Sequence, residues 1–189
     1  MAVSPDSELV ERLRRGEAAA FDVVYARYGK RLYGFLVRLT GRRDLADDLY
    51  QETWLRLARH AGRLAPETDL AGWLYTVARN QYFDHHRSAA LDGERLRETH
   101  MLPLPQAAEA PDEAAAASDT RERLERALAD LSPAHREVLL LVAVEGLAQD
   151  QVAQILGIEN DAVRQRLSRA RAQLSERLEG RERGARAVQ

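Results

Sequence analysis

The chain has 189 residues, 45% of them hydrophobic, and a formal net charge of −2 at pH 7. It contains no cysteine, which excludes disulfides and cysteine-based zinc sites. No apolar run approaches the roughly 18 residues of a membrane span, and the N-terminal segment is too charged for a signal peptide. We therefore expect a cytoplasmic protein of one or two domains that does not insert into a membrane. Its charge argues against a strongly basic, free-standing DNA binder.

Residues 4–88 have the pattern of one small helical domain. Helices are predicted over 4–16, over 17–39, after Gly41 with Asp44 as its cap, and over 69–87. Apolar residues at helical spacing in the second helix are interpreted as core: Phe21, Val24, Tyr25, Tyr28, Leu32, Phe35, Leu36 and Leu39. No convincing run has the period of two that strands require, so the predicted fold class is all-α.

Acidic and amide side chains gather near the start of the third predicted helix, at Asp47, Asp48, Gln51 and Glu52. Acids at this position interact favourably with the helix dipole, which is a purely structural explanation. A surface that binds a basic partner is the other interpretation. The residues alone favour neither.

The fourth predicted helix mixes aromatic, amide and basic side chains on one side, at Thr76, Arg79, Asn80, Phe83 and Arg87. Unstacked bases of a single strand bind to such a surface, because aromatic rings stack, amides bond base edges and cations bind phosphates. A core face beside a solvated face would explain the same residues. On the residues alone, that structural explanation is the better one.

Composition changes after this helix. Residues 89–118 are rich in alanine, proline and acids and lack aromatic residues, which indicates a flexible linker. A helix over 119–131 then opens a second small domain, 119–179, with Leu124, Leu128 and Leu131 turned inward. Residues 180–189 are predicted to be a disordered tail.

The second domain contains a helix-turn-helix signature. Ser132 is expected to cap a helix that has Pro133 at its first position and ends at Gly146. A short helix then ends at Gly157, and a third helix opens with Asn160 as its expected cap. The third helix buries Val163, Leu167, Ala170 and Leu174 and carries polar residues elsewhere: Arg164, Gln165, Arg166, Ser168, Arg169 and Arg171.

Charge is distributed unevenly within this motif. The arginines lie on the third helix, whereas the two helices before it carry the acids Glu137, Glu145 and Asp150. This polarity suits a basic helix that meets phosphates and an acidic face that meets something else. A solvated arginine face would explain the isolated motif equally well.

With these motifs in order, the chain resembles bacterial RNA polymerase sigma factors of the extracytoplasmic-function type over nearly its whole length. DDLYQETWLRLAR, residues 47–59, resembles the segment that binds the polymerase clamp. LAGWLYTVARNQYFDHHR, residues 70–87, resembles the helix that recognises the −10 element. Residues 131–174, from LSPAHREV to SRARAQL, resemble the domain that recognises the −35 element.

The resemblance implies a role for each candidate residue. Asp47, Asp48, Gln51 and Glu52 match the surface for the coiled coil of the polymerase β′ clamp. Melted −10 DNA would meet Thr76, Arg79, Asn80, Phe83 and Arg87, after a loop at 63–69 that captures a flipped base. The −35 duplex would meet Arg164, Gln165, Arg166, Ser168, Arg169 and Arg171.

The implied partners are core RNA polymerase, through its β′ clamp coiled coil and β flap, and promoter DNA, with an anti-sigma protein as a further candidate. The resemblance implies no cofactor, no metal and no enzymatic activity, because the polymerase supplies the chemistry. Two alternatives are a sigma-like module that sequesters an anti-sigma protein, and a plain helix-turn-helix regulator. The chain departs from the family pattern at Ala148, which cannot cap its helix, and at Glu159, which stands where a capping Ser or Thr is usual. Asp161 places a negative charge near an expected phosphate contact.

Overall fold

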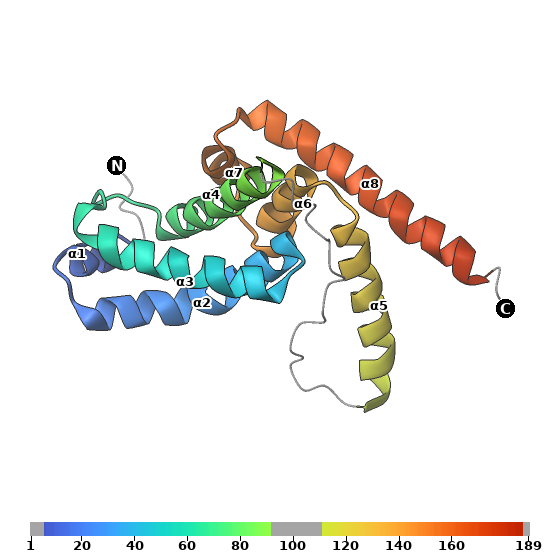
Figure 1. The fold of residues 1–189 in the computed structure, drawn as a ribbon, viewed down its shortest axis with the longest axis horizontal. Helices are drawn as coiled ribbons and strands as arrows, with labels where there is room; N and C mark the ends of the chain where they lie inside the picture. The colour runs from blue at the N-terminus through green and yellow to red at the C-terminus, as the bar shows by residue number, and fades with distance from the viewer. Residues whose placement is uncertain (1–5, 92–110, 187–189) are drawn as a thin grey trace.

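The computed structural model describes residues 6–91 and 111–186, and every regular element in these ranges is a helix (Figure 1). This confirms the all-α prediction. The elements are α1 (Ser7–Arg14), α2 (Ala18–Thr40), α3 (Arg43–His60), η1 (Ala61–Arg63), α4 (Leu70–Leu91), α5 (Pro111–Ala129), α6 (Pro133–Leu139), η2 (Leu140–Val144), α7 (Gln149–Leu156) and α8 (Asn160–Arg186).

The N-terminal unit is built around a hairpin of α2 and α3, which α4 crosses and α1 closes at one end (Figure 1). Gly41 makes the turn of the hairpin with φ +68°, a conformation that glycine adopts without steric cost. The core of the N-terminal unit contains the fully buried side chains of Phe35, Leu36, Leu57 and Leu74. The apolar periodicity of α2 and α3 therefore predicted their buried faces.

Two details of this unit differ from the sequence prediction. Tyr25 was expected in the core, but it is 46% exposed because its ring lies on the outer surface of the hairpin, against Tyr50 and Trp54. Asp44 was expected to cap α3, but Arg42 holds the N-cap position and Asp44 lies in the first turn. A carboxylate there still interacts favourably with the helix dipole.

In the C-terminal unit, Ser132 caps α6 as expected: its hydroxyl accepts the backbone N–H of His135, and Pro133 is the first helical residue. One continuous α-helix was predicted from there to Gly146. Instead, the helix widens into a π-helical turn, η2, in which Glu145 N–H donates to Leu140 O at 2.9 Å. A π-helical turn accommodates one extra residue, and Ala143 within it is exposed.

The helix-turn-helix is present as α7, a turn at Gly157 with φ +64°, and α8. Asn160 is not the cap of α8, because the carbonyl of Glu159 accepts the first helical N–H, from Val163 at 3.1 Å. On α5, Leu124 is 40% exposed, since the buried side of that helix carries Glu125, Ala127 and Leu128.

Helical structure extends into both ends of the expected linker and into the expected tail. α4 continues to Leu91 and α5 begins at Pro111, so the predicted 89–118 linker is helical at both ends, and 92–110 lie outside the described residues. α8 runs past Leu178 to Arg186, where a disordered tail was predicted, and 187–189 lie outside the description. Among the described helices, none combines the length and the apolar character that crossing a membrane requires.

The two units pack against one another. α7 lies against α4, and α5, α6 and η2 lie against α2. The buried apolar side chains form one continuous cluster that includes Leu74 of α4 and Val152 and Ile155 of α7. The described parts of the chain therefore share a core, which the prediction of two separate small domains did not include.

Candidate polymerase and nucleic-acid interfaces

The acidic residues predicted on the third helix lie together on the outward side of α3. Asp47, Asp48 and Gln51 are exposed, and the Glu52 side chain is 38% exposed. Oε1 of Glu52 accepts from Nε of Arg56 at 3.1 Å, within the same helix. None of these four side chains is buried. We call this set, Asp47, Asp48, Gln51 and Glu52, the acidic face of α3.

An aromatic groove of about 340 Å³ borders the acidic face. Trp54 forms its floor, with the ring centroid of Tyr25 at 4.9 Å and that of Phe21 at 5.7 Å. On its rim, Tyr25 and Leu55 are 46% and 49% exposed. Sequence reasoning missed the groove because it assigned Phe21 and Tyr25 to the core. An aromatic groove beside acids suits an amphipathic helix with basic flanks.

Three of the candidate −10 residues on α4, Arg79, Asn80 and Phe83, form a connected cluster. The Arg79 guanidinium stacks 4.8 Å from the ring centroid of Phe83, and its Nη1 donates to Oδ1 of Asn80 at 2.7 Å. Asn80 is exposed and Thr76 partly exposed, whereas Arg87 lies further along α4 in an ion pair with Asp84. The structure thus brings Arg79, Asn80 and Phe83 into contact, and Arg87 stands apart.

The candidate −35 residues lie along α8, and most point to solvent. Gln165, Ser168, Arg169 and Arg171 are exposed, and the Arg164 side chain is 63% exposed. Arg164 pairs with Asp161, so this acid engages a candidate DNA contact directly.

Two further details concern the exposure of Arg166 on α8 and the capping of α7. Arg166 is an exception among the arginines, with a side chain only 30% exposed. α7 is partly capped despite Ala148, because the Gln151 side chain accepts the Ala148 N–H at 3.2 Å.

Glu137 of α6 lies between the two sets of DNA-binding candidates. Its side chain is 1% exposed; Oε2 accepts from Nε of Arg79 at 2.9 Å, and Nη1 of Arg166 lies 3.5 Å from Oε1. Burial raises the pKa of the Glu137 carboxyl above its ordinary value, although both guanidinium groups act in the opposite direction. One buried carboxylate therefore engages one arginine from α4 and one from α8.

A second carboxylate joins the units at the end of η2. Oε2 of Glu145 accepts from the Tyr75 hydroxyl of α4 and, at 3.1 Å, from Nε of Arg31 of α2. Burial and the bond to Glu145 raise the pKa of Tyr75, so its hydroxyl remains a proton donor. Nearby, Nε2 of Gln151 in α7 donates to Oδ2 of Asp69 at 3.1 Å.

These contacts identify the partner of the acidic helices. The sequence predicted that the acids before α8 face something other than DNA, and for Glu137 and Glu145 that partner is the N-terminal unit. Asp150 instead remains exposed and accepts the N–H of Gln151. No sequence signal named Tyr75, Arg31 or Asp69 as partners, because the pairs are 70 or more residues apart.

Comparison with known proteins decides the family. The model for sigma-70 region 2 matches residues 24–91, and the model for sigma-70 region 4 matches residues 121–174. The chain belongs to the sigma-70 family. It is an extracytoplasmic-function sigma factor, which binds core RNA polymerase and directs promoter-specific initiation. Sigma factors are not catalytic enzymes.

Relatives resemble this sigma factor over most of their length. It is 37% identical to the RNA polymerase sigma factor CarQ of Myxococcus xanthus, over 89% of this chain and 95% of CarQ. It is 36% identical to the ECF sigma factor SigL of Mycobacterium tuberculosis, over 80% of this chain and 84% of SigL. The solved structure of CnrH in complex with the cytosolic domain of CnrY is 26% identical, with a TM-score of 0.69 over 93% of this chain and 97% of that one.

Proposed function

We propose that this sigma factor binds the polymerase clamp through the acidic face of α3 and the aromatic groove beside it. The acids suit a basic partner helix, and the half-exposed Tyr25 and Leu55 suit its apolar side. Burial of these rings would contribute most of the affinity, whereas the exposed acids would set orientation and rate of association.

We further propose that α4 binds the −10 element as a melted strand. The connected cluster of Arg79, Asn80 and Phe83 supplies a cation, an amide and an aromatic ring within one turn of helix. Bases offer their faces and pairing edges to such groups only after the duplex opens. Because opening costs a few kcal/mol, preferential binding of the open strand moves the equilibrium toward melting.

α8 is proposed to read the −35 element as duplex in the major groove. Arginine pairs with guanine edges and glutamine with adenine edges, and Arg169 and Gln165 both point to solvent. The observation that carries the proposal is this chemical division on one chain: a helix suited to single strands and a helix suited to duplex. Two weak contacts joined by one chain give a strong combined affinity.

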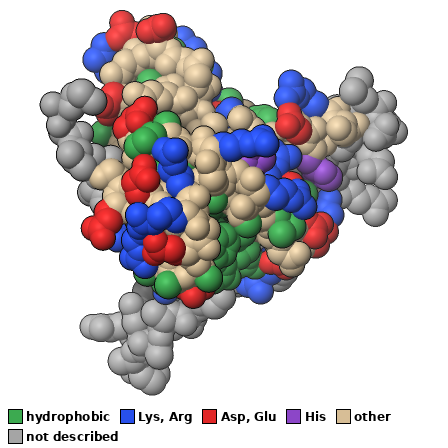
Figure 2. Space-filling view, turned by 90° about the vertical axis from the view of Figure 1, so that its left-hand side faces the viewer, with side chains coloured by type: hydrophobic (Ala, Val, Ile, Leu, Met, Phe, Trp, Pro, Cys, Tyr) green, Lys and Arg blue, Asp and Glu red, His purple; other side chains and the backbone are tan. Residues whose placement is uncertain are grey.

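Surface charge suggests that the polymerase supplies part of the attraction to DNA. The net charge is −2, and on the face in Figure 2 basic and acidic side chains are interspersed. The free protein should therefore bind duplex DNA only at non-specific strength, with a Kd on the order of 10⁻⁴–10⁻⁶ M at physiological salt.

A regulatory protein is proposed as a further partner. CnrH, which this chain resembles over 93% of its length, was solved with the cytosolic domain of CnrY bound. The aromatic groove and acidic face offer a surface on which such a protein would compete with polymerase.

Transcription in vitro tests the proposal. Core polymerase should initiate at the target promoter only when this protein is added, and permanganate footprinting should detect unpaired thymines in the −10 element. Polymerase that initiates equally well without the protein, or promoter opening that never depends on it, would refute the proposed function. Tight, sequence-specific duplex binding by the free protein would instead indicate an ordinary repressor or activator.

A further inference from the structure

A second hollow lies beside the aromatic groove, on the α2 side of the same surface. It has a volume of about 490 Å³, and its lining includes Tyr25, Gly29 and Tyr33 of α2 and Asp47 and Tyr50 of α3. We call it the tyrosine hollow. Tyr25 and Tyr50 also line the aromatic groove, so the two depressions share a wall. Because Asp47 belongs to the acidic face, the tyrosine hollow is continuous with the surface proposed for polymerase.

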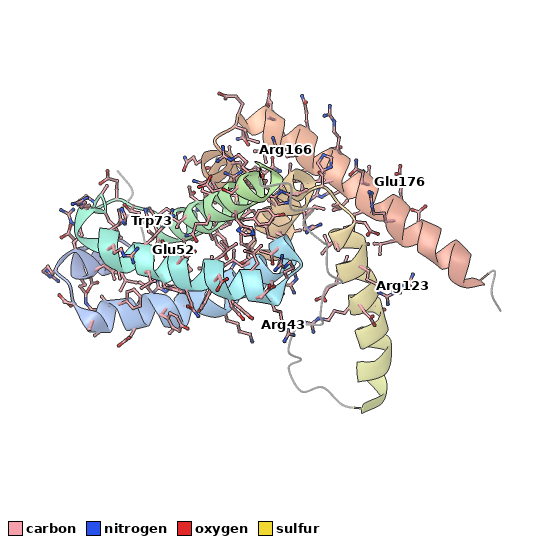
Figure 3. The ribbon with its side chains drawn as sticks, viewed as in Figure 1. Arg43, Glu52, Trp73, Arg123, Arg166 and Glu176 are labelled. Atoms are coloured by element: carbon pink, nitrogen blue, oxygen red, sulfur yellow. The ribbon has the colours of Figure 1, made fainter. Side chains whose placement is uncertain are left out.

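Tyr50 lies at the centre of the aromatic rings on this surface. Its ring centroid is 5.4 Å from that of Tyr33, 5.9 Å from that of Trp54 and 6.1 Å from that of Tyr25. All three pairs meet edge to face, which is a favourable arrangement of aromatic rings. Figure 3 shows the stretch of α3 before the labelled Glu52 lying along α2. The position of the Tyr50 ring between these helices therefore influences the rings around it.

Gly29 makes room for the Tyr50 ring. It is buried in the middle of α2, and a Cβ atom there would lie 2.8 Å from the Tyr50 hydroxyl oxygen, which is closer than two such atoms can approach. The next nearest atoms belong to Tyr25 and Trp54, at 3.8 and 3.9 Å, which are ordinary contact distances. Glycine within a helix is less favourable than alanine. The ring that it admits, and not helix formation, therefore explains a glycine at this position.

The Tyr50 hydroxyl connects this buried position to an exposed ring. Burial, and then a hydrogen bond with Tyr25, raise the pKa of Tyr50 above its ordinary value, so the hydroxyl stays protonated. The Tyr25 side chain is 46% exposed and is one of the two apolar contacts proposed for the polymerase helix. A side chain that is held in its binding conformation loses less freedom on association, which strengthens binding. Gly29 can therefore affect the partner surface without touching the partner.

We propose that Gly29 and Tyr50 are positioning residues for core polymerase: Gly29 admits the Tyr50 ring between α2 and α3, and that ring holds Tyr25 where the clamp helix packs. The proposal rests on the proposed function for the identity of the partner, a basic amphipathic helix of the polymerase clamp. The same helix would extend its contact from the acidic face onto the tyrosine hollow, because Asp47 offers a basic side chain a carboxylate there.

Gly29→Ala tests the position with the smallest possible side chain. The added methyl group would collide with the Tyr50 hydroxyl and displace the ring, which should weaken binding of the full-length protein to core polymerase about tenfold, as for partial loss of one aromatic anchor. The matched control is Gly34→Ala on the same helix. A Cβ atom there would meet only Nη1 of Arg38, at 3.2 Å and at the end of a flexible side chain, and Gly34 lines neither depression. Both substitutions favour the helix, so helix stability does not explain a difference between them.

A rescue experiment separates the position of the ring from any other effect of Gly29. Tyr50→Phe removes the one atom with which the new methyl group collides. In that background, Gly29→Ala should change the Kd for core polymerase less than about twofold, against about tenfold in the presence of Tyr50. A glycine needed only for the backbone of α2 would cause the same loss in both backgrounds. Equal losses would therefore overturn the proposal, as would Gly29→Ala binding as tightly as Gly34→Ala.

Tryptophan fluorescence reports the ring position without polymerase. The chain has two tryptophans, so Trp73→Phe leaves Trp54, whose ring neighbours Tyr50, as the single reporter. Gly29→Ala should shift the emission of Trp54 to longer wavelength as water replaces the displaced ring, and Tyr50→Phe should reverse the shift. Unchanged emission in Gly29→Ala would show that the ring is not displaced and would overturn the proposal. If circular dichroism shows that Gly29→Ala is poorly folded, Tyr50→Leu removes the ring with no added bulk. It should also weaken polymerase binding about tenfold, and full retention of binding would contradict the proposal.

The outcomes distinguish this proposal from the proposed function. An unchanged protein that does not bind core polymerase at all would sink the proposed function. Normal polymerase binding and promoter-dependent transcription by the unchanged protein, with equal effects of Gly29→Ala and Gly34→Ala, would sink the positioning role alone. A tenfold loss in Gly29→Ala that Tyr50→Phe reverses, together with the matching change in Trp54 emission, would support it.

Discussion

Arg136 is expected to hold together the end of α5 and the start of α6. Its side chain is almost fully buried, and its guanidinium donates to four backbone carbonyls. Two belong to the last residues of α5, Leu128 and Ala129, and one to Leu131 in the turn that follows. The fourth, Leu39 O at 2.9 Å, belongs to the end of α2. The last carbonyls of a helix lack helical donors, so this one side chain satisfies groups that would otherwise be buried without a partner.

Arg136→Met keeps most of the apolar stem and removes the donors. The Leu128 carbonyl still accepts a bond from the N–H of Leu131 at 3.1 Å. The carbonyls of Leu39, Ala129 and Leu131 lose the donor that the Arg136 guanidinium supplies. At about 1 kcal/mol for each buried acceptor, the free energy of unfolding should fall by about 3 kcal/mol. That is roughly a hundredfold increase in the unfolding equilibrium constant.

Urea denaturation followed by circular dichroism, with hydrogen exchange mass spectrometry over residues 124–144, measures this loss. The control is Arg126→Met, because Arg126 is half-exposed and pairs only along its own helix with Glu122 at 3.1 Å. A surface pair of this kind contributes less than about 1 kcal/mol. Equal losses for the two variants, or a loss below about 1 kcal/mol for Arg136→Met, would refute the assignment of Arg136 as the donor that closes α5.

Four further predictions follow from the proposed surfaces and from one charged helix terminus. Arg169→Ala should lower promoter affinity of the holoenzyme by about 1–3 kcal/mol and relax preference at one base pair of the −35 element, as measured by competition with single-base variants; uniform weakening on all sequences would indicate a phosphate contact instead. Asp48→Arg should leave the helical signal and Tm unchanged but weaken core polymerase binding in a pull-down, and full retention of binding would exclude the acidic face. Asn80→Ala should reduce permanganate reactivity of the −10 element and spare closed-complex binding; normal opening would remove α4 from that role. The pKa of Asp44 is lowered to about 2, first by the bond from Arg42 and then by a backbone N–H. Because the folded-state pKa lies below the ordinary one, ionised Asp44 stabilises the fold above about pH 4 and this contribution is lost as the pH falls toward 2. An NMR titration midpoint near 4 for Asp44, or an unaltered acid denaturation curve for Asp44→Asn, would contradict this.

Local sequence determined the secondary structure and the candidate residues of this protein. The helical spacing of Phe35, Leu36 and Leu39 is sufficient to identify the buried side of α2, because each helix presents one side to whatever packs on it. Ser132 followed by Pro133, and glycine at 157, encode a helix start and a helix end through their own backbone chemistry. Motif order then sufficed to identify the family.

Tertiary structure alone decided which surfaces are open and which are covered. Tyr25 follows the same spacing as core residues, and only the packing of α2 on α3 leaves its ring on a groove instead of in the core. Arg79 and Glu137 are 58 residues apart, and nothing in either segment encodes their contact at 2.9 Å. A carboxylate on an exposed helix and one buried between two arginines have the same local sequence signature. The difference arises because the two units pack against one another and α8 packs on α6, so that the Glu137 side chain is buried and the guanidinium groups of Arg79 and Arg166 are its partners.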